Sequence, residues 1–150
     1  IQSKLDSKLF IQYRDEANEL LKAKKFFEAL EMYEKCLKVT RKATTLDNIS
    51  IYVNKIACLL FLEKLERVVS EANEAIRLIR NFRNKNENTK MSKEDKERLK
   101  QMDLRVAVRK GNALAKLART IDAIAEYERA LKIDPGNASV QKDLDKIRKQ

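Results

Sequence analysis

The scarcity of helix-breaking residues constrains the fold of this chain more than any other feature of its sequence. Only two Gly and one Pro occur in 150 residues. Apolar residues recur every three or four positions along most of the chain, and the two-residue alternation of a half-buried strand is absent. A chain of this length forms one domain and buries a core if nearly all of it takes part. The sequence therefore predicts a single all-α domain.

Seven helices are expected from the apolar periodicity and from signals at the helix ends. Asp47 or Asn48 can cap the third helix and Asn137 the last, and Ser92 with Asp95 resembles a capping box. The polar, aperiodic stretch 83–91 is expected to be a loop. Short links make consecutive helices antiparallel neighbours. The expected helices are Ser7–Lys24, Phe26–Lys42, Asp47–Leu62, Leu65–Phe82, Ser92–Lys116, Thr120–Ile133 and Asn137–Lys149.

The segment 104–116 combines two stripes on one expected helix. A packing stripe is formed by Leu104, Ala107, Gly111 and Leu114, and a polar, mostly cationic one by Arg105, Arg109, Asn112 and Lys116. Gly inside a helix costs about 1 kcal/mol relative to Ala. Gly111 therefore predicts a place where another helix comes too close for a side chain.

The packing positions of three helix pairs align with one another, in registers that begin at Tyr13, Tyr52 and Ala107. The aligned positions carry aromatic and small residues, as in Tyr13, Ala17 and Tyr33 of the first pair. This pattern resembles the tetratricopeptide repeat, a helix-turn-helix unit of 34 residues. The resemblance implies a right-handed superhelical stack of three repeats, at about 7–42, 47–82 and 92–134, closed by a capping helix at 137–149. The longer intervals between registers, 39 and then 55 residues, depart from the family pattern.

In such a stack the first helix of each pair lines a concave groove. Five polar residues on these helices are expected to converge there, namely Arg14, Asn18, Asn54, Arg105 and Arg109. The rest of the expected lining is Leu21, Lys22, Ala57, Leu60, Phe61, Asn112 and Lys116. Leu60 and Phe61 fit equally well as packing residues or as a pocket for an apolar ligand side chain. Guanidinium forks and amide donors together suit two closely spaced carboxylates.

The five converging positions are similar to the carboxylate clamp of the tetratricopeptide family. That likeness implies binding of the extreme C-terminus, Glu-Glu-Val-Asp, of cytosolic heat-shock protein 90 or heat-shock protein 70, and hence a co-chaperone or adaptor. The third repeat and the tail ALKIDPGNASVQKDLDKIRKQ are similar to the C-terminal domain of dynein axonemal assembly factors of the dyslexia-candidate type. This second likeness implies that the chaperone is recruited to preassemble dynein arms in the cytoplasm.

Several function classes are disfavoured by what the sequence lacks. It has no His and no Gly-rich phosphate loop, so we expect no enzyme, no metal and no cofactor. Cys36 and Cys58 lie in apolar stripes and are expected to be reduced core thiols. No apolar run approaches the roughly 20 residues that span a bilayer, so we expect a cytoplasmic monomer without a membrane partner. The chain begins at Ile1 rather than Met, which suggests a fragment of a longer protein.

The net charge of +10 leaves other partners open. A nucleic acid is not expected, because the basic residues are dispersed among 23 acids and the aromatic residues fall on packing positions. Two alternatives to terminus binding remain: a scaffold that binds an internal peptide or helix in the same groove, and a basic helical repeat that binds nucleic acid.

Overall fold

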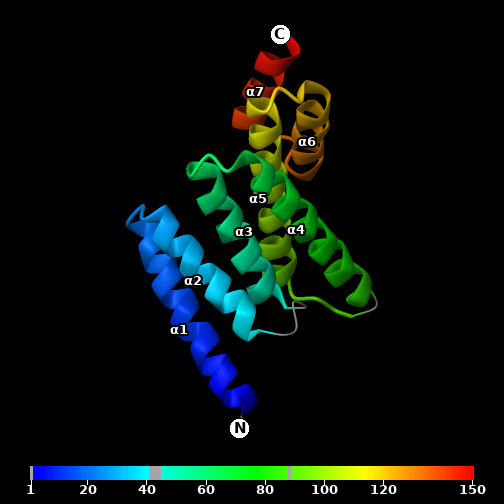
Figure 1. Cartoon of the computed structure of the whole chain (residues 1–150). Coiled ribbons are helices and arrows are strands. Elements are labelled where there is room, and N and C mark those ends of the chain that lie inside the picture. The colour runs from blue at the N-terminus through cyan, green and yellow to red at the C-terminus, as the bar shows by residue number, and fades with distance from the viewer. Residues whose placement is uncertain (1, 41–44, 88) are drawn as a thin grey trace.

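The structure, a computed structural model, describes the backbone of residues 2–40, 45–87 and 89–150, with side chains from residue 4 onward. The described residues form helices and no strand, so the all-α prediction is confirmed (Figure 1). The helices are α1 (Gln2–Lys22), α2 (Phe26–Val39), α3 (Leu46–Phe61), α4 (Leu65–Lys85), α5 (Lys93–Lys116), α6 (Thr120–Ile133) and α7 (Ala138–Arg148).

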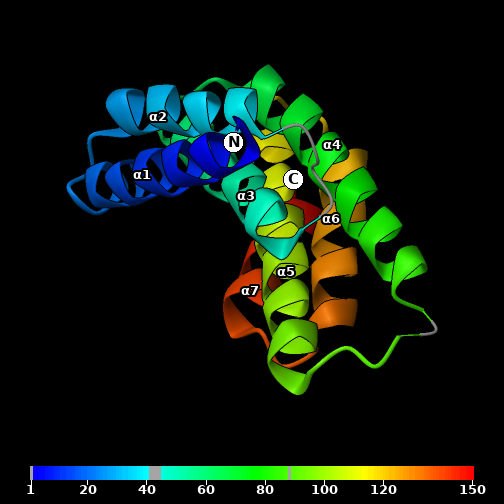
Figure 2. The same ribbon diagram turned by 90° about the horizontal axis from the view of Figure 1, so that it is seen from below.

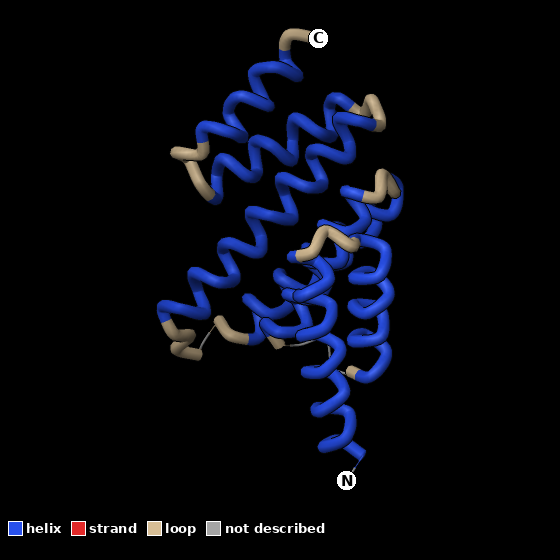
Figure 3. Tube along the Cα trace, turned by 90° about the vertical axis from the view of Figure 1, so that its left-hand side faces the viewer, coloured by secondary structure: helices blue, strands red, loops and turns tan. Residues whose placement is uncertain are grey.

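The helices are arranged as stacked hairpins. α1 packs on α2, α3 on α4 and α5 on α6, while α7 covers α6 at the end of the stack (Figures 1 and 3). The first helices of the second and third hairpins, α3 and α5, are also in contact with each other. One buried cluster runs from Ala17 of α1 through α2, α3 and α4 to α5, where it includes Val106 and Ala113. A second cluster joins Leu104, Ala107 and Leu114 of α5 to α6 and α7. α5 is therefore the element that links the two parts of the core.

The three hairpins turn in the same way. Lys24, Glu63 and Ala118 all have a left-handed backbone, with φ of 60°, 59° and 59°. In each turn the N–H of this residue and the N–H of the next one donate back to the end of the first helix, as Glu63 N to Leu60 O and Lys64 N to Leu59 O do in the second hairpin. The three residues are spaced by 39 and 55, the same intervals as the predicted registers. The equivalent turns thus support the alignment made from the sequence.

Some helix ends differ from those predicted. α1 begins at Gln2 rather than Ser7 and ends at Lys22, because the left-handed residue Lys24 belongs to the turn. α2 ends at Val39, where Thr40 becomes extended, and the predicted end at Lys42 lies outside the described residues.

The sequence predicted the capping residues of α5 and α7 correctly but not that of α3. α3 is capped by Thr45, whose Oγ1 accepts the Asn48 N–H at 3.2 Å, and not by Asp47 or Asn48. Ser92 and Asn137 cap α5 and α7, as predicted.

The long link between the second and third hairpins is mostly helical. α2 and α6 have 14 residues each, whereas α4 has 21 and α5 has 24. α4 continues to Lys85, so the first residues of the predicted loop 83–91 are helix. Figure 2 shows the ends of α4 and α5 extending toward the segment that connects them. The extra residues between the second and third registers therefore lengthen two neighbouring helices.

Gly111 lies where the two helices of the third hairpin meet. A Cβ on Gly111 would be 2.8 Å from Cε1 of Tyr127 on α6 and 2.9 Å from its Cδ1, closer than carbon atoms pack. The prediction of a close helix approach at this glycine is confirmed.

Candidate functional site

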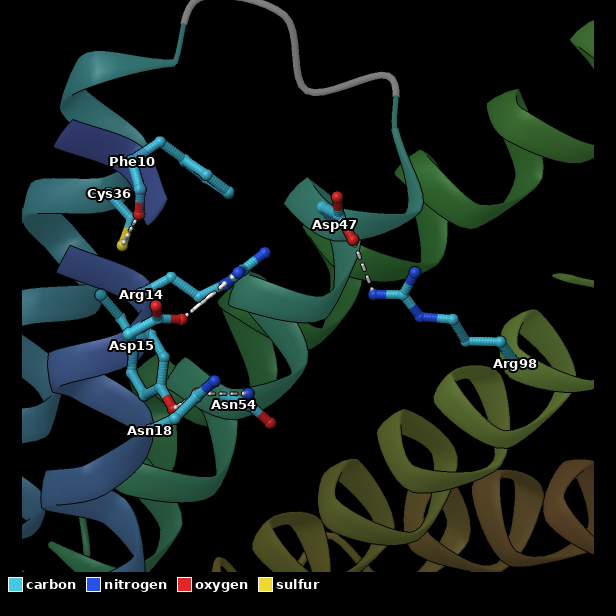
Figure 4. A network of polar contacts seen from close by, with 9 residues as sticks. Phe10, Arg14, Asp15, Asn18, Cys36, Asp47, Asn54 and Arg98 are labelled. Carbon is cyan, nitrogen blue, oxygen red and sulfur yellow. Dashed lines mark hydrogen bonds and ion pairs between the residues drawn. The ribbon is translucent and has the colours of Figure 1, made fainter. Parts of the chain in front are cut away.

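Two amides from the first helices of neighbouring hairpins meet in the structure. Asn18 on α1 and Asn54 on α3 are joined by a hydrogen bond, in which Nδ2 of Asn54 donates to Oδ1 of Asn18 at 3.5 Å (Figure 4). The same oxygen accepts the Tyr33 hydroxyl at 2.6 Å. Because Tyr33 is fully buried, this bond holds the Asn18 amide at the surface of the core. Both amides are half-buried.

Arg109 reaches the same region from α5. Its Nη1 donates to the carbonyl oxygen of Val53 at 2.8 Å, and Val53 directly precedes Asn54 on α3. Burial, together with the nearby charge of Arg105, lowers the pKa of Arg109 to about 10. The guanidinium is still cationic at pH 7, and no carboxylate pairs with it among the residues that the structure describes. A half-buried cation without a counter-ion favours an anionic ligand.

The other two predicted cations lie nearby but differ in their surroundings. Arg105 is one turn before Arg109, exposed, and within the described part of the chain it forms no ion pair. Arg14, one turn before Asn18, donates from Nε and Nη2 to Oδ1 of Asp15, at 3.3 Å in each case. Figure 4 shows Arg14 beside Asp15 rather than directed at the two amides. The structure thus brings Asn18, Asn54 and Arg109 together and leaves Arg14 paired with its neighbour.

The predicted groove lining is divided between a pocket, the core and the rim. Leu60, Asn112 and Lys116 line a pocket of about 340 Å³ next to α7. Ala57 was expected on the exposed stripe, but it is only 6% exposed and belongs to the core, because α3 is the middle helix and is covered on both sides. Leu21 packs on the core, and Lys22 forms an ion pair with Glu19 at 3.6 Å.

Phe61 combines the two roles that the sequence left open. It is 65% exposed, yet its ring stacks on Phe26 of the first hairpin at 4.3 Å between centroids. It packs against one neighbour and still offers one face to a ligand.

A repeated polar pair was missed in the sequence. The Tyr127 hydroxyl donates to Oδ1 of Asn112 at 2.7 Å, as Tyr33 does to Asn18 in the first hairpin. Both pairs are 15 residues apart, and the equivalent positions of the second hairpin carry Ala57 and Ala72. The alignment of the repeats places Asn18 over Asn112 and Tyr33 over Tyr127, so the sequence alone contains the signal for this repeated pair.

The potential metal ligands, the cysteines and the apolar character of the helices are further features of the described residues that bear on function. They contain no cluster of three His, Cys, Asp or Glu side chains that could hold a metal ion. Cys36 and Cys58 are buried and unbridged, as predicted for core thiols. Within the described ranges, no helix is both long and apolar enough to cross a bilayer.

The stacked helical hairpins have the fold of a tetratricopeptide-repeat domain, and residues 104–137 match the family model described as tetratricopeptide repeat. The match confirms the predicted resemblance to the tetratricopeptide repeat.

Relatives with curated descriptions include dynein axonemal assembly factor 4. The rat protein (Rattus norvegicus) is 30% identical over 135 residues, and the mouse protein (Mus musculus) is 29% identical over the same length. In both cases the match covers 90% of this chain and 28% of the relative. The chain therefore spans little more than a quarter of these proteins.

Solved structures share the whole fold at lower identity. One is described as the first TPR of Spaghetti (RPAP3) bound to HSP90 peptide SRMEEVD, with TM-score 0.72, 21% identity and coverage of 95% of this chain and 93% of that one. Another is the second TPR domain of human RPAP3 in complex with HSP70 peptide SGPTIEEVD, with TM-score 0.71, 20% identity and coverage of 97% and 99%. At these identities the likeness shows the fold alone.

Proposed function

We propose that this chain binds the C-terminal Glu-Glu-Val-Asp tail of heat-shock protein 90 or heat-shock protein 70 through a carboxylate clamp. The observation that carries the proposal is Arg109, a half-buried guanidinium that lies beside Arg105 and has no carboxylate partner in the described structure. Two like charges held close together repel each other, and an anion between them removes that cost. A chain terminus that ends in Asp supplies two carboxylates.

Each clamp residue has a distinct role in the proposal. Arg105 and Arg109 bind carboxylate oxygens through charge-assisted hydrogen bonds, which are about twice as strong as neutral ones. Asn18 and Asn54 donate amide N–H groups without adding charge. Arg14 reaches the ligand after leaving Asp15, a rearrangement that costs little because exposed ion pairs contribute roughly 0–1 kcal/mol.

The comparisons support this proposal without testing it. Two structures with the same fold hold peptides that end in Glu-Glu-Val-Asp, and the curated relatives are dynein axonemal assembly factors. We accordingly propose that the chain acts as a cytoplasmic co-chaperone module that brings the chaperone to dynein arms under assembly.

Fluorescence anisotropy of a labelled peptide that ends in Glu-Glu-Val-Asp tests the clamp. A hydrogen bond to a charged group contributes about 1.5–3 kcal/mol, so amidation of the peptide terminus should weaken binding by roughly 10-fold or more. Arg105→Ala should have an effect of similar size. Lys100→Ala, which removes an exposed cation from the same helix, is the charge-matched control and should leave the Kd within about 2-fold.

Circular dichroism monitors folding separately. Arg109→Ala is a less suitable variant than Arg105→Ala, because it also removes the hydrogen bond between Arg109 and the carbonyl of Val53, which joins α5 to α3. Arg105 makes no hydrogen bond within the described chain, so Arg105→Ala should keep the helical circular dichroism of the parent. Equal affinity for the free-acid and amidated peptides would assign the groove to an internal peptide instead. No peptide binding, together with duplex binding that falls steeply with salt, would assign the chain to nucleic acid.

A further inference from the structure

A second cluster of arginines lies on the side of α5 that faces away from the clamp residues. Its centre is Asp103, a carboxylate that is only 5% exposed. Asp103 precedes Arg105 by two residues, which is about 200° around a helix, so the two side chains leave α5 in opposite directions. Arg83 on α4 donates to one oxygen of Asp103 at 2.9 Å, and Arg129 on α6 donates to the other at 2.6 Å.

The cluster has more positive than negative charge. Arg129 also donates from Nε to Glu126 at 3.0 Å, and Glu126 is already paired with Lys110 at 2.9 Å. Arg80 is exposed and makes no ion pair with any described residue. Arg83, Arg129 and Lys110 therefore share the two carboxylates of Asp103 and Glu126, and Arg80 adds a fourth cation to the cluster. The excess charge remains available to a ligand.

One donor of the cluster has no partner among the residues that the structure describes. This donor is Nη2 of Arg129, which is buried, whereas Nε and Nη1 of the same side chain both form hydrogen bonds. A buried polar atom without a partner costs about 1–3 kcal/mol, more when the group is charged. Arg129 lines a pocket of about 210 Å³ together with Arg80 and Arg83, and Ile76 and Ile79 form its apolar wall. An oxyanion in this pocket would accept the unused N–H groups.

The pocket depends on a feature that the other two hairpins lack. α2 ends at Val39 and α6 at Ile133, and both positions are equivalent to Leu78 in α4. Arg80 and Arg83 lie beyond that point, in the extension of α4 toward Lys85. The extension of α4 thus adds two cations beyond the position at which the second helix of the other two hairpins ends.

We propose that this cluster is a second anion-binding site, which takes a carboxylate or phosphate group carried by an acidic segment of a protein partner. Guanidinium groups offer planar, bidentate donors to such oxyanions, and the apolar wall suits the carbon part of a peptide side chain better than a free ion. The site lies outside the groove, so a partner here can bind at the same time as a peptide in the groove.

The test is a titration of the 150-residue chain followed by the NMR signals of the arginine Nε–Hε groups. The probe is the blocked peptide Ac-Asp-Glu-pSer-Asp-Glu-NH₂, whose amidated end avoids the clamp, and the other arms are its unphosphorylated form and inorganic phosphate. We expect saturable shifts at Arg80, Arg83 and Arg129, and Arg80→Gln should weaken binding at least 5-fold without affecting the fold. Arg77→Gln on the same helix is the matched control, because Arg77 is already paired with Glu74.

The outcomes separate this site from the clamp and from a free anion. Arg105→Ala should leave the titration unchanged, whatever it does to binding in the groove. Shifts spread evenly over the exposed arginines, or an Arg80→Gln variant that binds as well as the parent, would overturn the proposal. Inorganic phosphate that binds as tightly as either peptide would also overturn it, because the site would then recognise a free ion.

Discussion

Replacement of Gly111 by Ala should destabilise the domain, although Ala is the better helix former. The substitution contributes about 1 kcal/mol of helix propensity. Against this, the new Cβ would lie 2.8 Å from the Tyr127 ring, which is only 3% exposed and tethered to Asn112 by its hydroxyl at 2.7 Å. Overpacking of a core costs about 1–3 kcal/mol, and loss of the hydroxyl bond costs about 1 kcal/mol. The balance is a net loss of about 2 kcal/mol.

Urea denaturation followed by circular dichroism measures this loss, and thermal unfolding should show a Tm lower by about 4–8 °C. The matched control is the same change in a Tyr127→Leu background, where the ring that causes the clash is gone. There Gly111→Ala should stabilise the protein by about 1 kcal/mol, which gives a coupling energy of about 3 kcal/mol between the two positions. A Gly111→Ala variant more stable than the parent would refute the close approach of α5 and α6.

Three further predictions concern stability and thiol chemistry. Ala118→Gly should stabilise the domain by about 1 kcal/mol in urea, because it relieves a left-handed residue, and an unchanged midpoint would contradict this. Lys55→Ala should cost about 3 kcal/mol by leaving Glu71 without its partner at 3.0 Å, whereas Lys55→Met with Glu71→Leu should stay within about 1 kcal/mol of the parent. Burial raises the pKa of Cys36 and Cys58 from 9.0 to about 11, so above pH 9 the unfolded chain loses these protons first. Their contribution to stability, present below pH 9, should therefore fall as the pH rises to 11, and both thiols should resist alkylation at pH 8 until the chain unfolds.

Signals within one helix turn predicted much of the fold. Ser92 and Asn137 each lie three residues before the backbone N–H group that they cap, so the sequence alone indicates both helix starts. Thr45 was missed because several residues there can cap a helix, and the choice depends on a distant contact. Asn48 lies inside the first turn of α3, where its own N–H is the group that Thr45 caps, and its side-chain amide donates to Thr40 at 3.1 Å.

Contacts between helices set the limits of prediction for the site. The sequence placed Asn18, Asn54 and Arg109 on the first helices of three repeats, and the structure brings them together. It could not show that Arg14 pairs with Asp15, because a side-chain direction is decided by its surroundings and not by spacing. Nor could it show that α4 continues past Phe82, since the ion pair that fixes Arg83 comes from Asp103, 20 residues away. Local sequence patterns thus predicted where helices form better than they predicted which side chains contact one another.

The Asn–Tyr pairs that join the two helices of a hairpin are either both present or both replaced by Ala. This difference between hairpins determines which amide lies beside Asn18. Asn18 with Tyr33 and Asn112 with Tyr127 join the two helices of the first and third hairpins, while the second has Ala at both positions. Removal of one member alone would bury an unsatisfied donor or acceptor at about 1–3 kcal/mol, so both are replaced together. With Ala57 in place of an amide, the nearest amide on α3 is Asn54, one turn earlier, and it donates to Asn18 on α1. The irregular second repeat is therefore the one whose amide connects α1 to α3, beside the carbonyl that binds Arg109.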